Sequence, residues 1–566
     1  MTISVLSSRP APAVRSGAPI GALGVRAGLL LCLALVAVPL LAAGTPPLFD
    51  YPNHLARVHI LHHWDRLALF HAHYGISSFL VPNVLSDLVL LGFMAFGDAH
   101  AAGRALLLVI AWGTLTGVLA LNRAATGRAS VWPLLGALLV FNEMFVWGFL
   151  NYLLGLVLLL WGMAAWLWLE RRPRAVQVAV GTAFALSLFL SHLVAFGLYG
   201  VAIAILELRR VWRAGTLWRT EGVGRLVVSA AQFVPALTLF LWVSPSSGLP
   251  VDLRFDYSLW GKLSPFARLL STGNPIADTG TLVLVVAIVA IGLATRRIGL
   301  HRDLALVAGA DLLLVLVLPY SALGSFFLDA RIVIATALVA IAAVTPRVAV
   351  DAGDVADRQA GARRWDRRPL LAVILVLVGV RTVVLVRDWH AQSEQYRPVL
   401  AALDRLPPGS ILVAGSAAPF ELGDWFSTRR IRPPREHVAT YATVDADVLV
   451  PNVFARAGQN PLVYTPAREE MAPLGRNPIL RLFGPDGLRH LATEAARVAS
   501  RRNVMDPPPT GVFVIAHHVR CDAWPADVPV RAAACGPDFS LMEVVPVAAG
   551  PAPDTRGGTA EETRMP

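Results

Sequence analysis

The residues best suited to chemistry lie in the segment TPPLFDYPNHLARVHILHHWDRLALFHAHYG, residues 45–75. A proline two residues after Asp50 can occupy the first turn of a helix, and Asn53, His54 and Arg57 then share one helix face. An acid, an amide, an imidazole and a guanidinium would converge there. Asp50 could be a general base or only a helix N-cap, and the other three are candidate substrate ligands.

A second candidate group lies in FNEMFVWGFLNY, residues 141–152, between two apolar runs. Glu143 is a candidate catalytic acid and Asn151 a candidate substrate ligand. The alternative interpretation is a polar cap on two helices, with the aromatic residues of this turn forming a membrane-interface belt.

Three further basic or titratable residues are candidate substrate ligands. His192 stands in a tight turn between two apolar runs, where it could meet a phosphate or cap a helix. Lys262, the only lysine, belongs to a mixed-charge loop that could also be an ordinary solvated loop. Arg331 opens an apolar run, where an arginine can either bind phosphate or extend to the membrane interface.

The composition is that of a membrane protein, so transmembrane helices must position these residues. The chain has 566 residues, of which 55% are hydrophobic and 15% charged, and its mean hydropathy is +0.59. These values lie outside the soluble globular range. The net charge of +11 comes almost wholly from arginines between apolar runs, which indicates membrane topology and not nucleic-acid binding.

Apolar runs long enough to cross a bilayer predict eleven transmembrane helices. They cover 27–43, 105–121, 131–147, 152–168, 175–191, 193–208, 226–243, 281–295, 304–319, 331–345 and 370–386. A twelfth segment, 80–97, carries several polar residues in its first half and could cross the membrane or lie along its surface.

Arginine placement decides between these two topologies. If 80–97 lies on the surface, the N-terminal tail and the loops on the same side of the membrane contain 22 arginines. The loops on the opposite side of the membrane contain 7 basic residues. The positive-inside rule then places the N-terminus in the cytoplasm and the C-terminus outside. A cleaved signal peptide is an alternative for the first run only, because small residues follow it.

The apolar runs end near residue 388, and a small α/β domain is expected beyond. Residues 410–416, 511–518 and 539–547 are predicted strands, and 390–406 and 487–502 have helical spacing. The predicted organisation, in chain order, is a cytoplasmic tail at 1–26, an all-α transmembrane domain at 27–387 with a first outer loop at 44–104, an α/β domain at 388–548 and a disordered tail at 549–566. In an oxidising compartment, Cys521 and Cys535 should form a disulfide.

The order of these features resembles the integral-membrane GT-C glycosyltransferases, and within them the protein O-mannosyltransferase and aminoarabinose-transferase branch. The resemblance covers roughly 45–210. It rests on the acid Asp50 opening the first outer loop, a Phe-Gly turn at 96–97 ending a surface helix, Arg104 opening the next span and a basic inner turn. Where that family usually has a second acid, this chain has Tyr51, so a metal dependence that relies on an acid pair is in doubt.

The resemblance implies a transferase that moves a sugar from a polyprenyl-phosphate carrier to a glycan, lipid or protein acceptor at the outer face of a bacterial-type inner membrane. Asp50 matches the family's loop acid and Glu143 its second site. Any cofactor is left open, with a divalent cation one option. The rival hypotheses are a non-catalytic polysaccharide-binding or assembly protein of the envelope and, third, a transporter. Transport is disfavoured because only Arg381 is found well inside a span and no second half repeats the first.

Overall fold

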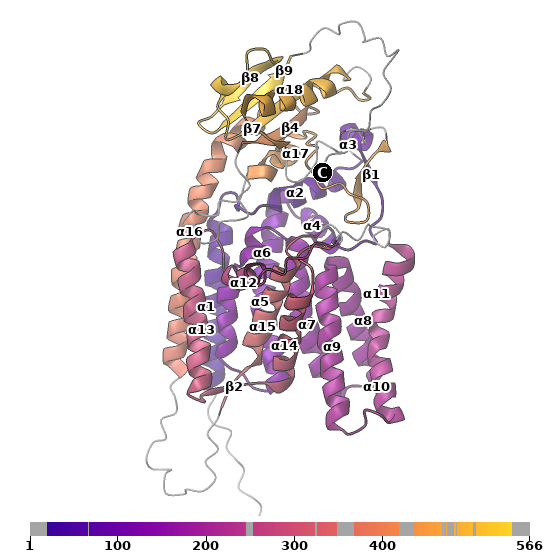
Figure 1. Ribbon diagram of the computed structural model, residues 1–566, viewed down its shortest axis with the longest axis vertical. Helices are drawn as coiled ribbons and strands as arrows, with labels where there is room; N and C mark the ends of the chain where they lie inside the picture. Colours follow the sequence, from indigo (N-terminus) through magenta and orange to yellow (C-terminus); the bar gives the residue numbers. More distant parts are fainter. Residues whose placement is uncertain are drawn as a thin grey trace, which may run out of the picture.

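A bundle of long apolar helices forms the larger part of the protein, and a small sheet domain stands on one end of it (Figure 1). The computed structural model describes residues 20–65, 67–244, 253–322, 325–347, 367–417, 435–466, 468, 471, 480–482, 484–501 and 505–545. The end of the bundle next to the sheet domain is called the domain end below, and the other end the far end.

A bundle helix overlaps each of the eleven predicted apolar runs, although the bundle helix in the run 131–147 has only eight residues. The bundle helices are α1 (Ile20–Ala42), α5 (Ala99–Thr126), η1 (Trp132–Leu139), α7 (Leu150–Trp168), α8 (Arg174–Ser191), α9 (Leu193–Arg213), α10 (Thr220–Ala230) with its continuation α11 (Val234–Thr238), α13 (Pro275–Ala294), α14 (Arg302–Val317), α15 (Leu328–Ala343) and α16 (Arg367–Leu403). Within the described part of the chain, seven helical stretches are long and apolar enough to cross a membrane. The prediction of an all-α polytopic domain is confirmed.

Short helices lie between the bundle and the sheet domain. They are α2 (Tyr51–His62), α3 (Ala68–His73), α4 (Leu85–Met94), α6 (Glu143–Val146) and α12 (Leu259–Ala267). The segment 80–97 contains only the ten-residue α4, about 15 Å at 1.5 Å per residue. That is half of the roughly 30 Å hydrocarbon core, so this helix is too short to span it.

The sheet domain contains a five-stranded sheet, and the prediction of a small α/β domain is confirmed. Its strand order is β6 (Leu480–Arg481), β4 (Ile411–Ser416), β7 (Val512–His517), β9 (Phe539–Val544) and β8 (Val530–Cys535), with α18 (Gly484–Ser500) against it. β4 is parallel to β6 and β7, whereas β9 is antiparallel to both of its neighbours. A disulfide joins Cys521 to Cys535, and Cys32 is free and buried in the bundle.

Backbone and side-chain contacts dock the sheet domain on the segment after α1. β1 (Tyr74–Ile76) pairs antiparallel with β5 (Leu462–Tyr464). His59 Nε2 lies 2.8 Å from Asp447 Oδ1, and His100 Nε2 lies 2.7 Å from Asp445 Oδ1. The helix α16 also runs without a break from the bundle into the domain (Figure 1). The segment 44–104 and the sheet domain are therefore packed together.

Candidate active site

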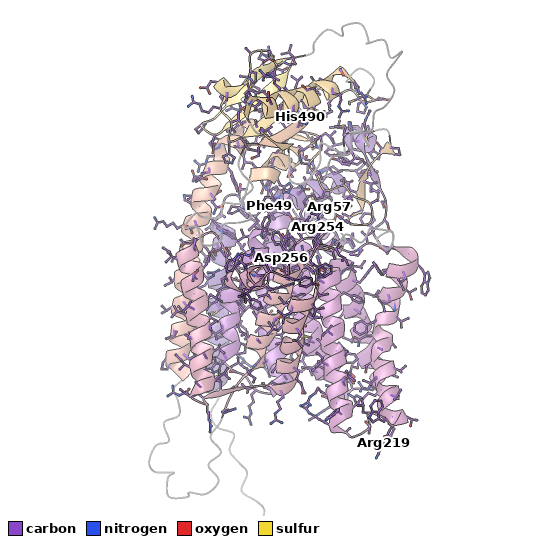
Figure 2. All side chains as sticks on the ribbon, in the orientation of Figure 1. Phe49, Arg57, Arg219, Arg254, Asp256 and His490 are labelled. Atoms are coloured by element: carbon purple, nitrogen blue, oxygen red, sulfur yellow. A yellow bond between two sulfur atoms is a disulfide. The ribbon has the colours of Figure 1, made fainter. Side chains whose placement is uncertain are left out.

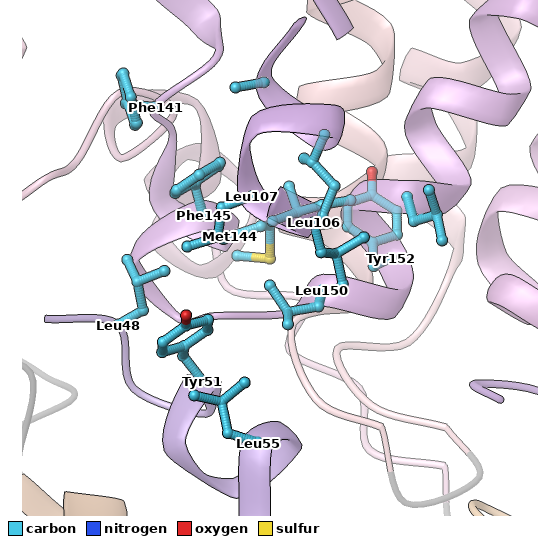
Figure 3. Close-up of a cluster of buried hydrophobic side chains, with 14 of the residues drawn as sticks. Leu48, Tyr51, Leu55, Leu106, Leu107, Phe141, Met144, Phe145, Leu150 and Tyr152 are labelled. Carbon is cyan, nitrogen blue, oxygen red and sulfur yellow. The ribbon is translucent and has the colours of Figure 1, made fainter. Parts of the chain in front are cut away.

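An apolar cluster fixes the first turn of α2 against the bundle. Leu48 and Tyr51 lie beside Met144 and Phe145, with Leu55 one turn further along α2 (Figure 3). Tyr51 is 1% exposed, and its hydroxyl has no hydrogen-bond partner among the described residues. The position at which the resemblance would place a second acid is thus filled by a packing residue.

Backbone pairing holds Asp50 next to the turn that follows α6. The amides of Phe49 and Asp50 donate to the carbonyls of Val146 and Trp147, each at 3.0 Å. Gly148 has φ +72°, and a Cβ there would stand 3.0 Å from the Asp50 nitrogen. Only glycine combines this conformation with such a close approach.

Asp50 occupies the N-cap position of α2, but its side chain makes no capping hydrogen bond. It is 8% exposed. Its Oδ1 lies 3.5 Å from Nε2 of His437, which comes from η6 (Arg435–Thr440) of the sheet domain. The carboxylate therefore faces the junction between bundle and domain instead of the backbone of its own helix.

Asn53 joins α2 to the sheet domain by three hydrogen bonds. Its amide nitrogen donates to the Asn452 carbonyl at 2.8 Å and contacts His437 Nδ1 at 3.0 Å. Its amide oxygen accepts from the Phe454 nitrogen at 2.6 Å. These contacts account for the whole amide, so Asn53 has a structural role.

Arg57 and His54 form a buried network with Asp87 of α4. Arg57 donates to both Asp87 oxygens, at 2.8 and 2.7 Å, and to His54 Nδ1 at 2.9 Å. Burial would raise the pKa of Asp87, but the charge and hydrogen bonds of Arg57, together with His54, hold it below its ordinary value. Figure 2 shows Arg57 between the bundle and the domain. The network ties α2 to α4.

Glu143 is held beside Arg268 at the domain end. Arg268 Nε lies 3.3 Å from Glu143 Oε1, and both side chains are buried. Asn142 caps α6 by accepting from the Phe145 amide at 3.1 Å. The predicted cap is therefore Asn142, which leaves the Glu143 carboxylate to interact with the cation.

Arg331 lies in the first turn of α15 over two aromatic rings. Its guanidinium carbon is 4.6 Å from the Phe149 ring centre and 5.7 Å from that of Tyr152. It also donates to Ser325 Oγ. Among the described residues no carboxylate lies within salt-bridge distance of Arg331, although the charge of Asp50 acts on it.

The other predicted ligands have structural contacts. His192 caps α9, because its Nδ1 accepts from the Val194 amide at 3.1 Å. Asn151 accepts hydrogen bonds from Ser86 and Ser191. Lys262 donates to the carbonyls of Val315 and Leu318 at the end of α14, at 3.0 and 2.9 Å.

Tyr320, which sequence reasoning missed, lies among the charges of this region. Burial raises its pKa to about 12, and four charged groups act on it: Arg268 and Arg331 lower its pKa, whereas Asp329 and Glu143 raise it. These groups come from α6, the end of α12 and the start of α15. His437 was missed as well, because it follows Asp50 by 387 positions and no local pattern marks it. Asp50, Glu143, Arg268, Tyr320 and Arg331 together are called the domain-end charge cluster below.

The described residues include no group of three or more His, Cys, Asp or Glu side chains placed to hold a metal ion. In the comparisons, no protein-family model and no curated protein matches this chain. Its fold is similar to two crystal structures of ArnT from Cupriavidus metallidurans, a GT-C glycosyltransferase. The structure bound to undecaprenyl phosphate shares 14% identity at a TM-score of 0.47, covering 95% of this chain and 100% of that one. The apo structure shares 13% at 0.49, covering 92% and 98%.

Proposed function

We propose that this protein is a membrane glycosyltransferase that transfers a sugar from a polyprenyl-phosphate carrier to a glycan, lipid or protein acceptor. The reaction takes place at the domain end of the bundle, on the outer face of a bacterial-type inner membrane. The N-terminus is cytoplasmic, because the 22 arginines of the predicted inner segments outnumber the 7 basic residues of the outer ones.

The observation that carries the proposal is that Asp50 and Arg331, which are not in direct contact, lie close enough for the charge of Asp50 to act on Arg331. Asp50 is a buried carboxylate whose side chain does not cap its helix, so it has no helix-forming task. Arg331 is a buried cation seated on aromatic rings. An acid and an unneutralised cation at one end of an apolar bundle match the needs of an acceptor hydroxyl and a lipid phosphate.

In this mechanism Asp50 is the general base. It takes the proton of the acceptor hydroxyl while that oxygen attacks the anomeric carbon from the side opposite the phosphate. The bond between the anomeric carbon and the phosphate oxygen breaks, its electron pair stays on the phosphate, and the configuration inverts. Arg331 and Arg268 stabilise the charge that develops on the departing phosphate. Glu143 positions Arg268 through their 3.3 Å contact.

The function is tested by the products in cells. Lipid-linked sugars and envelope glycans from cells with and without the gene are compared by mass spectrometry, and the missing sugar identifies the product. Complementation with Asp50→Asn then tests the base. Asparagine keeps the shape but accepts no proton, and loss of a general base costs about a hundredfold or more in rate.

A matched control is available in Asp98, which caps α5 by accepting from the Ala101 amide at 2.7 Å. Asp98→Asn is the same substitution at an exposed N-cap, where asparagine caps equally well. We expect it to restore the product fully, and Asp50→Asn to accumulate as folded protein without product. Normal product with Asp50→Asn would refute the catalytic role and favour a non-catalytic envelope protein.

A further inference from the structure

We infer that His437 of the sheet domain is a positioning residue for Asp50, so that the active site is completed by the domain and not by the bundle alone. The inference rests on the proposed function, since it assigns a partner to the proposed base. It follows from the contacts of Asn53, the ring environment of His437 and the docking of the domain.

The orientation of the Asn53 amide is fixed by two backbone groups. The Phe454 N–H can only donate, so the atom it meets is the amide oxygen, and the Asn452 carbonyl can only accept, so the atom it meets is the amide nitrogen. The same nitrogen lies 3.0 Å from His437 Nδ1. Asn53 must therefore donate to His437, which sets Nδ1 as an acceptor.

A neutral imidazole with Nδ1 as acceptor carries its hydrogen on Nε2. Burial, together with the nearby charge of His54, lowers the pKa of His437 to about 3, so the ring is neutral near pH 7. Its Nε2–H faces Oδ1 of Asp50 at 3.5 Å. This exceeds an ordinary hydrogen bond, but catalytic contacts are often long before the substrate binds.

The His437 ring is held by its neighbours as well as by Asn53. Phe49 and Phe454 meet it edge to face, with ring centres 4.9 and 5.2 Å away. His437 is 1% exposed. Asp50 and His54 are the titratable groups that act on it among the described residues. A ring fixed in place and in tautomer can orient one oxygen of Asp50 and leave the other for the acceptor hydroxyl.

Three substitutions at His437 separate positioning from packing. His437→Gln can place an amide N–H near the position of Nε2, whereas His437→Asn places its amide near Nδ1 and loses the donor to Asp50. His437→Phe keeps an aromatic ring and loses both nitrogens. His490→Gln, on the exposed surface of α18, is the matched control.

The measurement is kcat and KM of the purified full chain, obtained by following formation of the product identified above. We expect His437→Asn and His437→Phe to lower kcat about 10- to 100-fold at nearly unchanged KM, since small misplacements of catalytic groups cost that much. His437→Gln should recover most of the rate. Unchanged kcat in the two donor-free variants, or failure of both to fold, would overturn the inference. If Asp50→Asn is inactive while the His437 variants are fully active, the proposed function stands and the inference about His437 fails. An active Asp50→Asn would overturn both the proposed function and the inference.

A second inference comes from a groove at the far end, independent of the active site. The groove has a volume of about 730 Å³ and lies between the start of α1, the end of α5, η1 and α7. Arg26, Arg123 and Arg128 are exposed at its rim, and Trp161 and Trp168 belong to its apolar wall. None of the described lining residues is acidic.

We propose that this groove binds an anionic phospholipid of the cytoplasmic leaflet. No ion pair of these three arginines occurs among the described residues, so their charges are available to a phosphate. Asn122, Thr116 and Trp161 each donate to backbone carbonyls, so these lining groups are already occupied. Basic pockets between helices on the cytoplasmic side suit anionic headgroups, and the apolar wall suits acyl chains.

The test is thermal unfolding of the detergent-solubilised full chain with added phosphatidylglycerol, phosphatidylcholine or inorganic phosphate. We expect phosphatidylglycerol alone to raise the midpoint by a few degrees. The double variant Arg123→Gln/Arg128→Gln should lose this response. The control Arg171→Gln/Arg219→Gln changes two exposed arginines outside the groove and should keep it; Figure 2 shows Arg219 at the far end. An equal response to phosphatidylcholine or phosphate would refute the lipid site, and so would a response that the double variant keeps. A response that appears only after residues 1–19 are removed would also refute it, because that segment would then be the occupant of the groove.

Discussion

Replacing Arg381 by methionine should destabilise the protein and disturb the active site together. Arg381 lies on α16, inside the bundle, and is 5% exposed. It donates to Asp278 Oδ1 at 2.9 Å and to the carbonyls of Phe141 and Leu270 at 2.8 and 2.9 Å. Those carbonyls belong to the two segments that carry Glu143 and Arg268, so one guanidinium joins both halves of that ion pair.

The size of the effect follows from what the substitution leaves behind. Removing one partner of a buried ion pair typically costs about 3–5 kcal/mol, because the other charge stays buried. Asp278 also accepts hydrogen bonds from the amide and hydroxyl of Thr272, each at 2.7 Å, which compensate part of its charge. We therefore expect about 3 kcal/mol, the lower end of that range.

The assay is unfolding of the detergent-solubilised protein, with product formation measured below the unfolding transition. Arg387→Met is the matched control, since Arg387 lies six positions further along α16, is exposed and has no ion pair among the described residues. The double variant Arg381→Met/Asp278→Asn should be less destabilised than the two single changes add up to. Equal stability of Arg381→Met and Arg387→Met would refute the reasoning.

Three further predictions concern pH, the disulfide and topology. Because burial lowers the pKa of folded His437 to about 3, the unfolded chain binds a proton there that the folded chain does not. Between about pH 6.5 and pH 3, His437 should therefore contribute a loss of stability of about 1.4 kcal/mol per pH unit as the pH falls. Urea titrations at several pH values should show a slope for His437→Gln that is shallower by this amount. Labelling of unreduced, denatured protein should detect one thiol, Cys32, because Cys521 and Cys535 are paired, and three labelled thiols would contradict this. A reporter active only outside the cytoplasm should be active after residue 400 and silent near 360; the reverse pattern would place the charge cluster on the cytoplasmic face.

The bundle could be predicted from the sequence because membrane insertion depends on local composition. Each apolar run contains enough information to identify one helix. The strands 410–416, 511–518 and 539–547 were likewise visible as buried apolar runs, and they correspond to β4, β7 and β9. β8 was missed because most of its residues are exposed and carry no such run, and β6 because it has only two residues.

The candidate site could be predicted only in part, because its contacts join distant segments. Helical spacing brought Asn53, His54 and Arg57 to one face of α2, but it could not show that their partners lie on α4 and in the sheet domain. The pairing of Arg381 with Asp278 could not be predicted for the same reason. Asp311, a buried acid within α14, was overlooked because a single charge does not interrupt an apolar run.

Four arginines are buried among the described residues. Arg268 is paired with Glu143, and the other three differ in how their charges are compensated, which bears on function. Arg57 donates to both oxygens of Asp87, and Arg381 contacts Asp278 and two carbonyls, so each charge is met inside the protein. Burying a cation without such a partner is costly. Arg331 is 5% exposed and has aromatic rings and a serine as its contacts among the described residues. Aromatic faces compensate a cation only partly, so a bound anion would stabilise Arg331 in a way that the protein alone does not. A phosphate arriving at this end of the bundle would supply that anion, and for that reason we assign the donor phosphate to Arg331 and not to Arg57.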